Sequence, residues 1–99
     1  MELTERQKKH LRRLGHALHP LVTLGGQSGL TEGVALEMER ALTDHELVKV
    51  KSWLPDRESR EAAFATLALQ THSALVQRIG HVGLFYRPHK GIKRILLPD

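Results

Sequence analysis

Apolar residues recur with helical spacing in the first segment of the chain. Thr4 and Gln7 form a T-x-x-Q capping box, which predicts that a helix begins there, and Pro20 ends it. One side of this helix is apolar, with Leu3, Leu11, Leu14 and Leu18. The opposite side is basic, with Lys8, Lys9, Arg12, Arg13 and His16. We therefore predict an amphipathic helix that packs through its leucines.

Two more segments show helical spacing. The hydroxyl of Thr31 can cap a second helix, and Glu32 suits its first turn. The predicted inner face of this helix comprises Val34, Ala35, Met38, Ala41, Leu42 and His45. Leu36 falls on the outer face, where the pattern gives it no role. A third helix is predicted to open at Pro55 and Asp56, with Ala63, Phe64 and Leu67 as its inner residues.

Two strands are predicted between these helices. Residues 21–24 form a short apolar run between Pro20 and a glycine, which indicates a buried strand. In residues 47–51, apolar residues alternate with Lys49 and Lys51. Because successive side chains of a strand point to opposite faces, this strand is expected to have one apolar side and one side with two ammonium groups.

Two further strands are predicted near the end of the chain. Residues 75–79 and 84–87 have the composition of strands, and they are joined around Gly80 and Gly83, which favours a hairpin. The predicted order of elements is therefore α-β-α-β-α-β-β. This order indicates an α/β fold with three helices and four strands.

The length of the chain, 99 residues, suits one domain. Apolar residues make up 40% of the sequence and charged residues 26%, as in folded globular proteins. We predict a single domain over residues 1–99, with its core at about residues 3–88. Residues 89–99 form a basic tail, whose apolar end at residues 92–97 is expected to dock on the domain.

Several classes of chemistry lack their residues. The chain has no cysteine, which excludes disulfides, thiolate zinc sites and thiol nucleophiles. Its seven histidines form no H-E-x-x-H motif, so we expect no bound metal and no cofactor. No acid–base arrangement suited to catalysis is evident, so we expect no small-molecule substrate and no enzymatic activity. The apolar runs are short, so the chain is expected to be cytoplasmic, with no contact to a membrane.

The balance of charge favours a polyanionic partner. Lysine and arginine number 15 against 11 acidic residues, which gives a formal net charge of +4. The basic residues cluster at the two ends of the chain: Arg6, Lys8, Lys9, Arg12 and Arg13 in the first helix, and Arg87, Lys90, Lys93 and Arg94 near the end. A basic helix face is also typical of a solvated surface, and the residues alone leave both interpretations open.

A glycine-rich loop, Gly25 to Gly29, precedes the helix predicted at Thr31. A helix N-terminus offers unpaired N–H groups and the positive end of the helix dipole, so it attracts phosphate when glycine lets the backbone come close. The G-x-x-G spacing of residues 26–29 is also the spacing with which KH domains clamp a nucleic-acid backbone. The same spacing often closes an ordinary turn. The P-loop and dinucleotide-binding patterns are absent.

Three motifs in order resemble one family. They are LGGQSGLTEGV at the glycine loop, HELVKVK at residues 45–51 and LFYRPHK at residues 84–90. Together they are similar to the CRM domain (chloroplast RNA splicing and ribosome maturation), and more closely to its free-standing bacterial YhbY-type members, over about residues 3–98. The resemblance implies a four-stranded mixed sheet packed with three helices, similar to the C-terminal domain of bacterial initiation factor three.

The resemblance also implies a function and a set of RNA-binding residues. It implies a non-enzymatic factor that binds ribosomal RNA in precursors of the large ribosomal subunit. The loop role passes to Gly26, Gln27, Ser28 and Gly29, and the lysine of the strand motif is Lys49. The adjoining basic surface is expected to include Lys8, Lys9, Arg12, Arg13 and Lys51. Many family members carry a basic residue inside the loop, whereas this loop is uncharged.

Three alternatives stay open from the sequence. A protein-interaction module of a ribonucleoprotein would use the apolar residues 95–97 or Leu36. A binder of other small RNAs would share the basic surface, and an enzyme acting on RNA ends would need a metal or an acid–base pair.

Phe85 and Tyr86 point to opposite sides of their predicted strand, so at most one of them is expected to stack on a base, and the other lies in the core.

Overall fold

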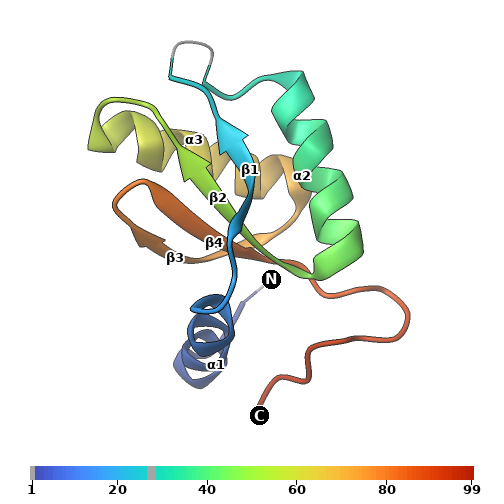
Figure 1. Cartoon of the computed structure of the whole chain (residues 1–99). Coiled ribbons are helices and arrows are strands. Elements are labelled where there is room, and N and C mark those ends of the chain that lie inside the picture. The colour runs from blue at the N-terminus through green and yellow to red at the C-terminus, as the bar shows by residue number, and fades with distance from the viewer. Residues whose placement is uncertain (1, 27–28) are drawn as a thin grey trace.

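A computed structural model describes residues 2–26 and 29–99 of the chain. Its elements are α1 (Glu5–Gly15), β1 (Pro20–Leu24), α2 (Glu32–His45), β2 (Leu47–Ser52), α3 (Arg57–Thr71), β3 (Ala74–Ile79) and β4 (Val82–Tyr86). This order, α-β-α-β-α-β-β, is the predicted one (Figure 1).

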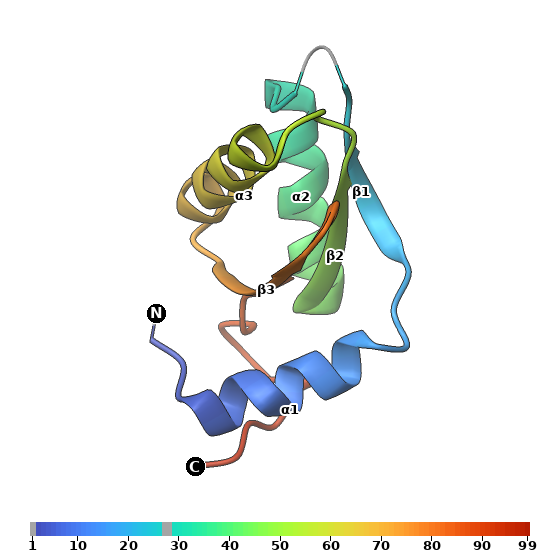
Figure 2. The same ribbon diagram turned by 90° about the vertical axis from the view of Figure 1, so that its left-hand side faces the viewer.

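The four strands form one mixed sheet in the order β1-β2-β4-β3. β1 and β2 are parallel and are connected by α2, whereas β4 pairs antiparallel with both β2 and β3. Helices α2 and α3 cover one face of the sheet, and α1 crosses the opposite face at one end (Figures 1 and 2). The glycine loop lies at the other end of β1 (Figure 1).

The helices begin where their capping residues predict. At α1, the Gln7 N–H donates to Thr4 Oγ1 at 3.1 Å and the Thr4 N–H donates to Gln7 Oε1 at 3.0 Å, which completes the capping box. Thr31 caps α2 by accepting from the Val34 N–H at 3.2 Å. Asp56 caps α3 through the Ser59 N–H at 2.9 Å, so each predicted helix start is confirmed.

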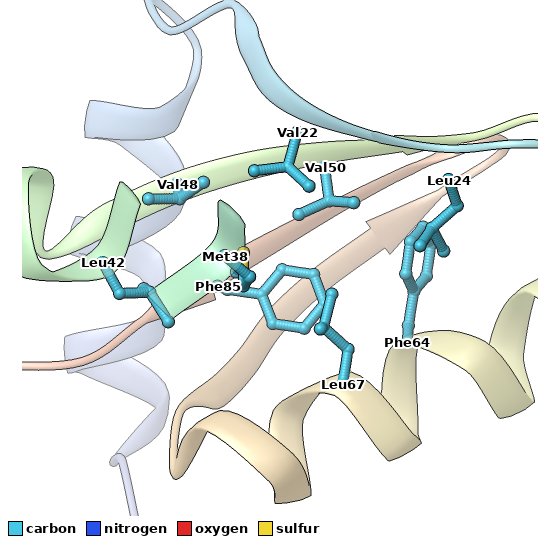
Figure 3. Close-up of a cluster of buried hydrophobic side chains, with 9 residues drawn as sticks. All are labelled: Val22, Leu24, Met38, Leu42, Val48, Val50, Phe64, Leu67 and Phe85. Carbon is cyan, nitrogen blue, oxygen red and sulfur yellow. The ribbon is translucent and has the colours of Figure 1, made fainter. Parts of the chain in front are cut away.

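The larger hydrophobic core lies between the sheet and the helices α2 and α3 (Figure 3). Phe64 from α3 meets Phe85 from β4 edge to face, with ring centroids 5.7 Å apart. The remaining residues of this core are Val22, Leu24, Met38, Leu42, Val48, Val50 and Leu67. Most inner residues predicted for the second and third helices therefore reach this core. His45 is exposed instead, because it lies in the last turn of α2.

A second core lies on the opposite face of the sheet, beneath α1. It contains Leu11, Leu47, Val76, Leu84 and Tyr86, and Leu3, Leu18, Ile95 and Leu97 pack against it. The face of β2 that carries Lys49 and Lys51 is therefore not wholly polar, because Leu47 on the same face is buried. Phe85 and Tyr86 are both buried, one in each core, so neither presents its ring for stacking in this structure.

Two predicted faces differ from the structure. Leu14 is 40% exposed, because α1 contacts the sheet through Leu11 and the buried Gly15, where an added Cβ would lie 2.8 Å from Leu84 Cδ2. β1 is only half-buried: Leu21 is exposed, while Val22 lies in the core. The reason is its position at the edge of the sheet, where one face of the strand is left without a covering helix.

The hairpin between β3 and β4 turns earlier than predicted. Its turn lies at Gly80, which has a φ of +55°, and Gly83 falls inside β4 opposite Val50 of β2. A Cβ at Gly83 would lie 3.2 Å from the Phe64 ring and 3.0 Å from the Phe85 ring. Gly83 is therefore a packing residue, which lets the two phenyl rings approach the sheet.

The C-terminal tail is held by the buried carboxylate of Glu46, between α2 and β2. Glu46 Oε1 accepts the N–H groups of Arg94 and Ile95, both at 2.9 Å, and Oε2 accepts that of His89 at 2.7 Å. Gln7 of α1 donates a further bond to Pro98 O at 3.0 Å. The tail lies against the domain, and two of its apolar side chains, Ile95 and Leu97, pack against the second core.

Burial raises the pKa of Glu46, but the three backbone N–H groups that stabilise its charged form outweigh burial and leave the pKa below its ordinary value of 4.5. A group with a depressed pKa in the folded state stabilises the fold above its unfolded pKa. That contribution is lost as the pH falls through the folded pKa.

We expect Glu46→Gln to lower the free energy of unfolding at neutral pH by about 2 kcal/mol, because the amide offers one acceptor oxygen where the carboxylate offers two charged ones. Urea unfolding is measured from pH 7 to pH 3. The difference in free energy of unfolding between wild type and variant should decrease below about pH 4.5. A difference that stays constant with pH would contradict this account of Glu46.

Candidate nucleic-acid interface

The glycine loop is closed by its own backbone. The Gly29 N–H donates to Gly25 O at 3.2 Å, and the two residues form a β-bridge. Gly29 has a φ of +59°, a conformation that other residues rarely adopt. Gln27 and Ser28, the two uncharged residues of the predicted G-x-x-G site, lie outside the described residues. The N–H of Gly29 is thus engaged within the loop.

The start of α2 is less favourable to phosphate than the sequence suggested. Thr31 caps the N–H of Val34, and the carboxylate of Glu32 lies in the first turn, where it complements the positive end of the helix dipole. The negative charge of Glu32 would oppose a phosphate at the same helix end. Phosphate binding by the loop therefore stays a prediction, and charge for it must come from other elements.

The basic residues of α1 meet the lysine side of β2. Lys49 lies opposite Leu84 of β4, on the face that α1 crosses. Arg12 and His16 join Lys49 around a hollow of about 240 Å³. The hollow is completed by Gly15, Gln77, Ile79, Val82 and Leu84. Two predicted residues far apart in the sequence, Arg12 and Lys49, are thus brought together by the packing of α1 on the sheet.

The basic surface continues outward along α1. Lys9 and Arg13 are exposed, and with Arg12, His16 and Gln77 they line a shallower hollow of about 370 Å³. Lys8 lies elsewhere. It forms an ion pair with Glu5 at 3.6 Å and lines a different hollow with Glu2, Leu3, Ala74 and Leu75.

Lys51 extends the basic surface toward the glycine loop. Its Nζ lies 4.2 Å from the ring centroid of Trp53, a cation–π contact. A Cβ at Gly26 would lie 3.4 Å from Trp53 O, so the loop lies directly beside this residue. Trp53 was missed by the sequence-based prediction. Its spacing could have identified it, because Lys49, Lys51 and Trp53 occur at every second residue and so share one face of an extended chain.

We define the basic face as Lys9, Arg12, Arg13, Lys49 and Lys51. Within residues 2–26 and 29–99, none of these five side chains forms an ion pair. The acidic side chains that do form ion pairs, Glu5, Glu39 and Glu61, are paired with other basic residues. Like charges that gather without counter-charges repel one another, so this arrangement favours an anionic ligand.

In the described parts of the chain, no three histidine or acidic side chains come together in a way that could hold a metal ion. None of the described helices combines the length and apolar character needed to cross a membrane. A hollow of about 760 Å³ lies away from the basic face, at Glu39, Thr43, His72 and Arg87 to Lys90.

Two known proteins are similar in sequence to this chain over nearly its whole length. A probable RNA-binding protein of Pseudomonas aeruginosa is 46% identical over 99 aligned residues, which cover 96% of this chain and 94% of the relative. An RNA-binding protein of Haemophilus influenzae is 47% identical, with 97% of this chain and 95% of the relative covered.

A solved structure and a family model extend this similarity. The solution structure of a hypothetical protein from Staphylococcus aureus superposes with a TM-score of 0.85 at 34% identity, covering 98% of this chain and all of that one. The family model of the CRS1/YhbY (CRM) domain matches residues 3–87, which include the glycine loop and the whole sheet. This chain belongs to the CRS1/YhbY (CRM) domain family.

Proposed function

We propose that this chain is an RNA-binding protein that acts without catalysis in assembly of the large ribosomal subunit. The observation that carries RNA binding is the basic face, five cations without ion-pair partners on one side of the described structure. The names of the relatives support the same ligand. The ribosomal role rests on the likeness to YhbY-type proteins.

The proposed contact is electrostatic and follows the sheet. Arg12 and Arg13 of α1 attract phosphates at one end of the RNA segment. Lys49 and Lys51 of β2 bind the following phosphates, so the RNA backbone runs across β2 toward the glycine loop. In the loop, backbone N–H groups and the side chains of residues 27–28 offer uncharged hydrogen bonds to phosphate. The cations are therefore assigned most of the affinity.

The packing of the C-terminal tail argues against the alternative of a protein-interaction module. Ile95 and Leu97 pack on the second core, so they are engaged within the fold. Leu36, Ile92 and Leu96 are exposed, and exposed apolar side chains are common on folded proteins.

Salt dependence tests the electrostatic mechanism. If about five phosphates of single-stranded RNA are neutralised, the slope of log K against log salt should be about −3.5. We expect Arg12→Gln and Lys49→Gln each to weaken binding and to bring the slope closer to zero by about 0.7.

Arg40→Gln is the matched control, because it removes one charge from α2 on the other face of the sheet. Its effect on affinity should be smaller than that of either test variant. A slope near zero, or equal losses in all three variants, would exclude specific use of the basic face.

The glycine loop is best tested at Gly26. Gly29 is unsuitable, because any side chain there is strained by its positive φ. Gly26 has room for a Cβ at 3.4 Å from Trp53 O. We expect Gly26→Asp to weaken RNA binding about fivefold, through about 1 kcal/mol of repulsion from phosphate. Gly26→Ala should bind nearly as wild type. Equal affinities for Gly26→Asp and wild type in a filter-binding assay would mean that phosphate does not approach the loop.

Co-sedimentation through a gradient of cell lysate tests the ribosomal part of the proposal. We expect the tagged chain to migrate with particles near the large subunit at low salt, and Lys49→Gln or high salt to release it. Migration with small free RNAs instead would keep RNA binding and reject the ribosomal role.

A further inference from the structure

Trp53 is exposed where a large aromatic ring is normally covered. Its indole is the largest of the standard side chains, yet the residue is 55% exposed. It is also the only tryptophan in the sequence. Trp53 is adjacent to two features that Proposed function assigns to RNA: Lys51 of the basic face lies over its ring, and Gly26 of the glycine loop lies next to its backbone.

The backbone around Trp53 is firmly positioned. The Trp53 N–H donates to Leu24 O of β1 at 3.0 Å, and the preceding Ser52 N–H donates to His81 O at 2.7 Å. The His81 ring adds a bond between its Nδ1 and Ser52 O at 2.9 Å. These bonds fix the Cα of Trp53 against two neighbouring segments, so the ring is presented from a rigid base rather than from a mobile loop.

The ring also has neighbours suited to a nucleotide. Lys51 Nζ lies over one face of the indole, 4.2 Å from the ring centroid, and the His81 ring lies 6.3 Å away at an angle of 44°. A base stacked on the other face of the indole would therefore have an ammonium group across the ring, available to its phosphate.

We propose that Trp53 is a stacking platform for an unpaired base of the bound RNA. The proposal rests on the proposed function and adds a preference for single-stranded segments. Every base has a flat π-face, so stacking on an indole requires no particular sequence, whereas a duplex hides those faces between its base pairs. The positive charge of Lys51 over the ring, with Lys49 two residues earlier on the same strand, favours a nucleic acid over an apolar protein segment.

Because Trp53 is the only tryptophan, its fluorescence reports on this site alone. Wild-type protein is titrated with three ligands of about ten nucleotides: a single-stranded RNA, the same RNA as a duplex, and a single strand without bases. We expect the complete single strand to quench the fluorescence most. The abasic strand should bind through its phosphates with little quenching.

Variants at the same position separate stacking from general apolar contact. Trp53→Leu keeps an apolar side chain but removes the aromatic face, and it should bind the single-stranded RNA on the order of tenfold more weakly. Trp53→Phe keeps an aromatic face and should recover most of this loss. Affinities of both variants are measured by anisotropy of labelled RNA, and urea unfolding confirms that both are folded.

The outcomes distinguish this inference from the function on which it rests. Salt-dependent binding by wild type with equal affinity for Trp53→Leu, or equal quenching by the abasic strand, would reject stacking and leave RNA binding in place. Absence of RNA binding by wild type would reject both. Stronger binding to the duplex than to the single strand would also overturn the stacking proposal.

Discussion

The buried carboxylate of Glu46 joins the parts of the molecule on which the basic face depends. It is fully buried, it follows α2 with a φ of +48°, and it accepts three backbone N–H groups from the tail. An unpaired carboxylate would be costly in such a place, so the tail must bind there. The bound tail supplies Ile95 and Leu97 to the core beneath α1, and this core sets the position of that helix.

The position of α1 then decides what the outer face of the sheet presents. The helix covers the end of the face at Leu47 and Tyr86, and it leaves the end that carries Lys51 and Trp53 open. Arg12 lies at the border, where it meets Lys49. Helix α1 crosses one end of the sheet face (Figure 2), and this single contact both buries apolar residues and brings Arg12 next to Lys49.

In the proposed mechanism, the basic face and the uncharged loop contribute differently to binding of an RNA backbone. Cations such as Lys49 attract phosphate over a Debye length, about 8 Å at physiological salt. Glycines allow close approach but bring no charge, and Glu32 at the start of α2 opposes phosphate. The indole of Trp53, which extends from a hydrogen-bonded backbone next to the glycine loop, would supply the contact to bases that neither of them offers.

The sequence alone determined the order of elements and the helix starts, because capping bonds such as those at Thr4 and Asp56 and the period of apolar residues act over a few positions. It also indicated the family and all five cations of the basic face. Only the tertiary structure decided that Gly83 packs under two rings, that Lys8 lies apart, and that Trp53 stands beside the glycine loop. These facts depend on which segments meet across the sheet, and pairing between distant segments leaves no local pattern to read.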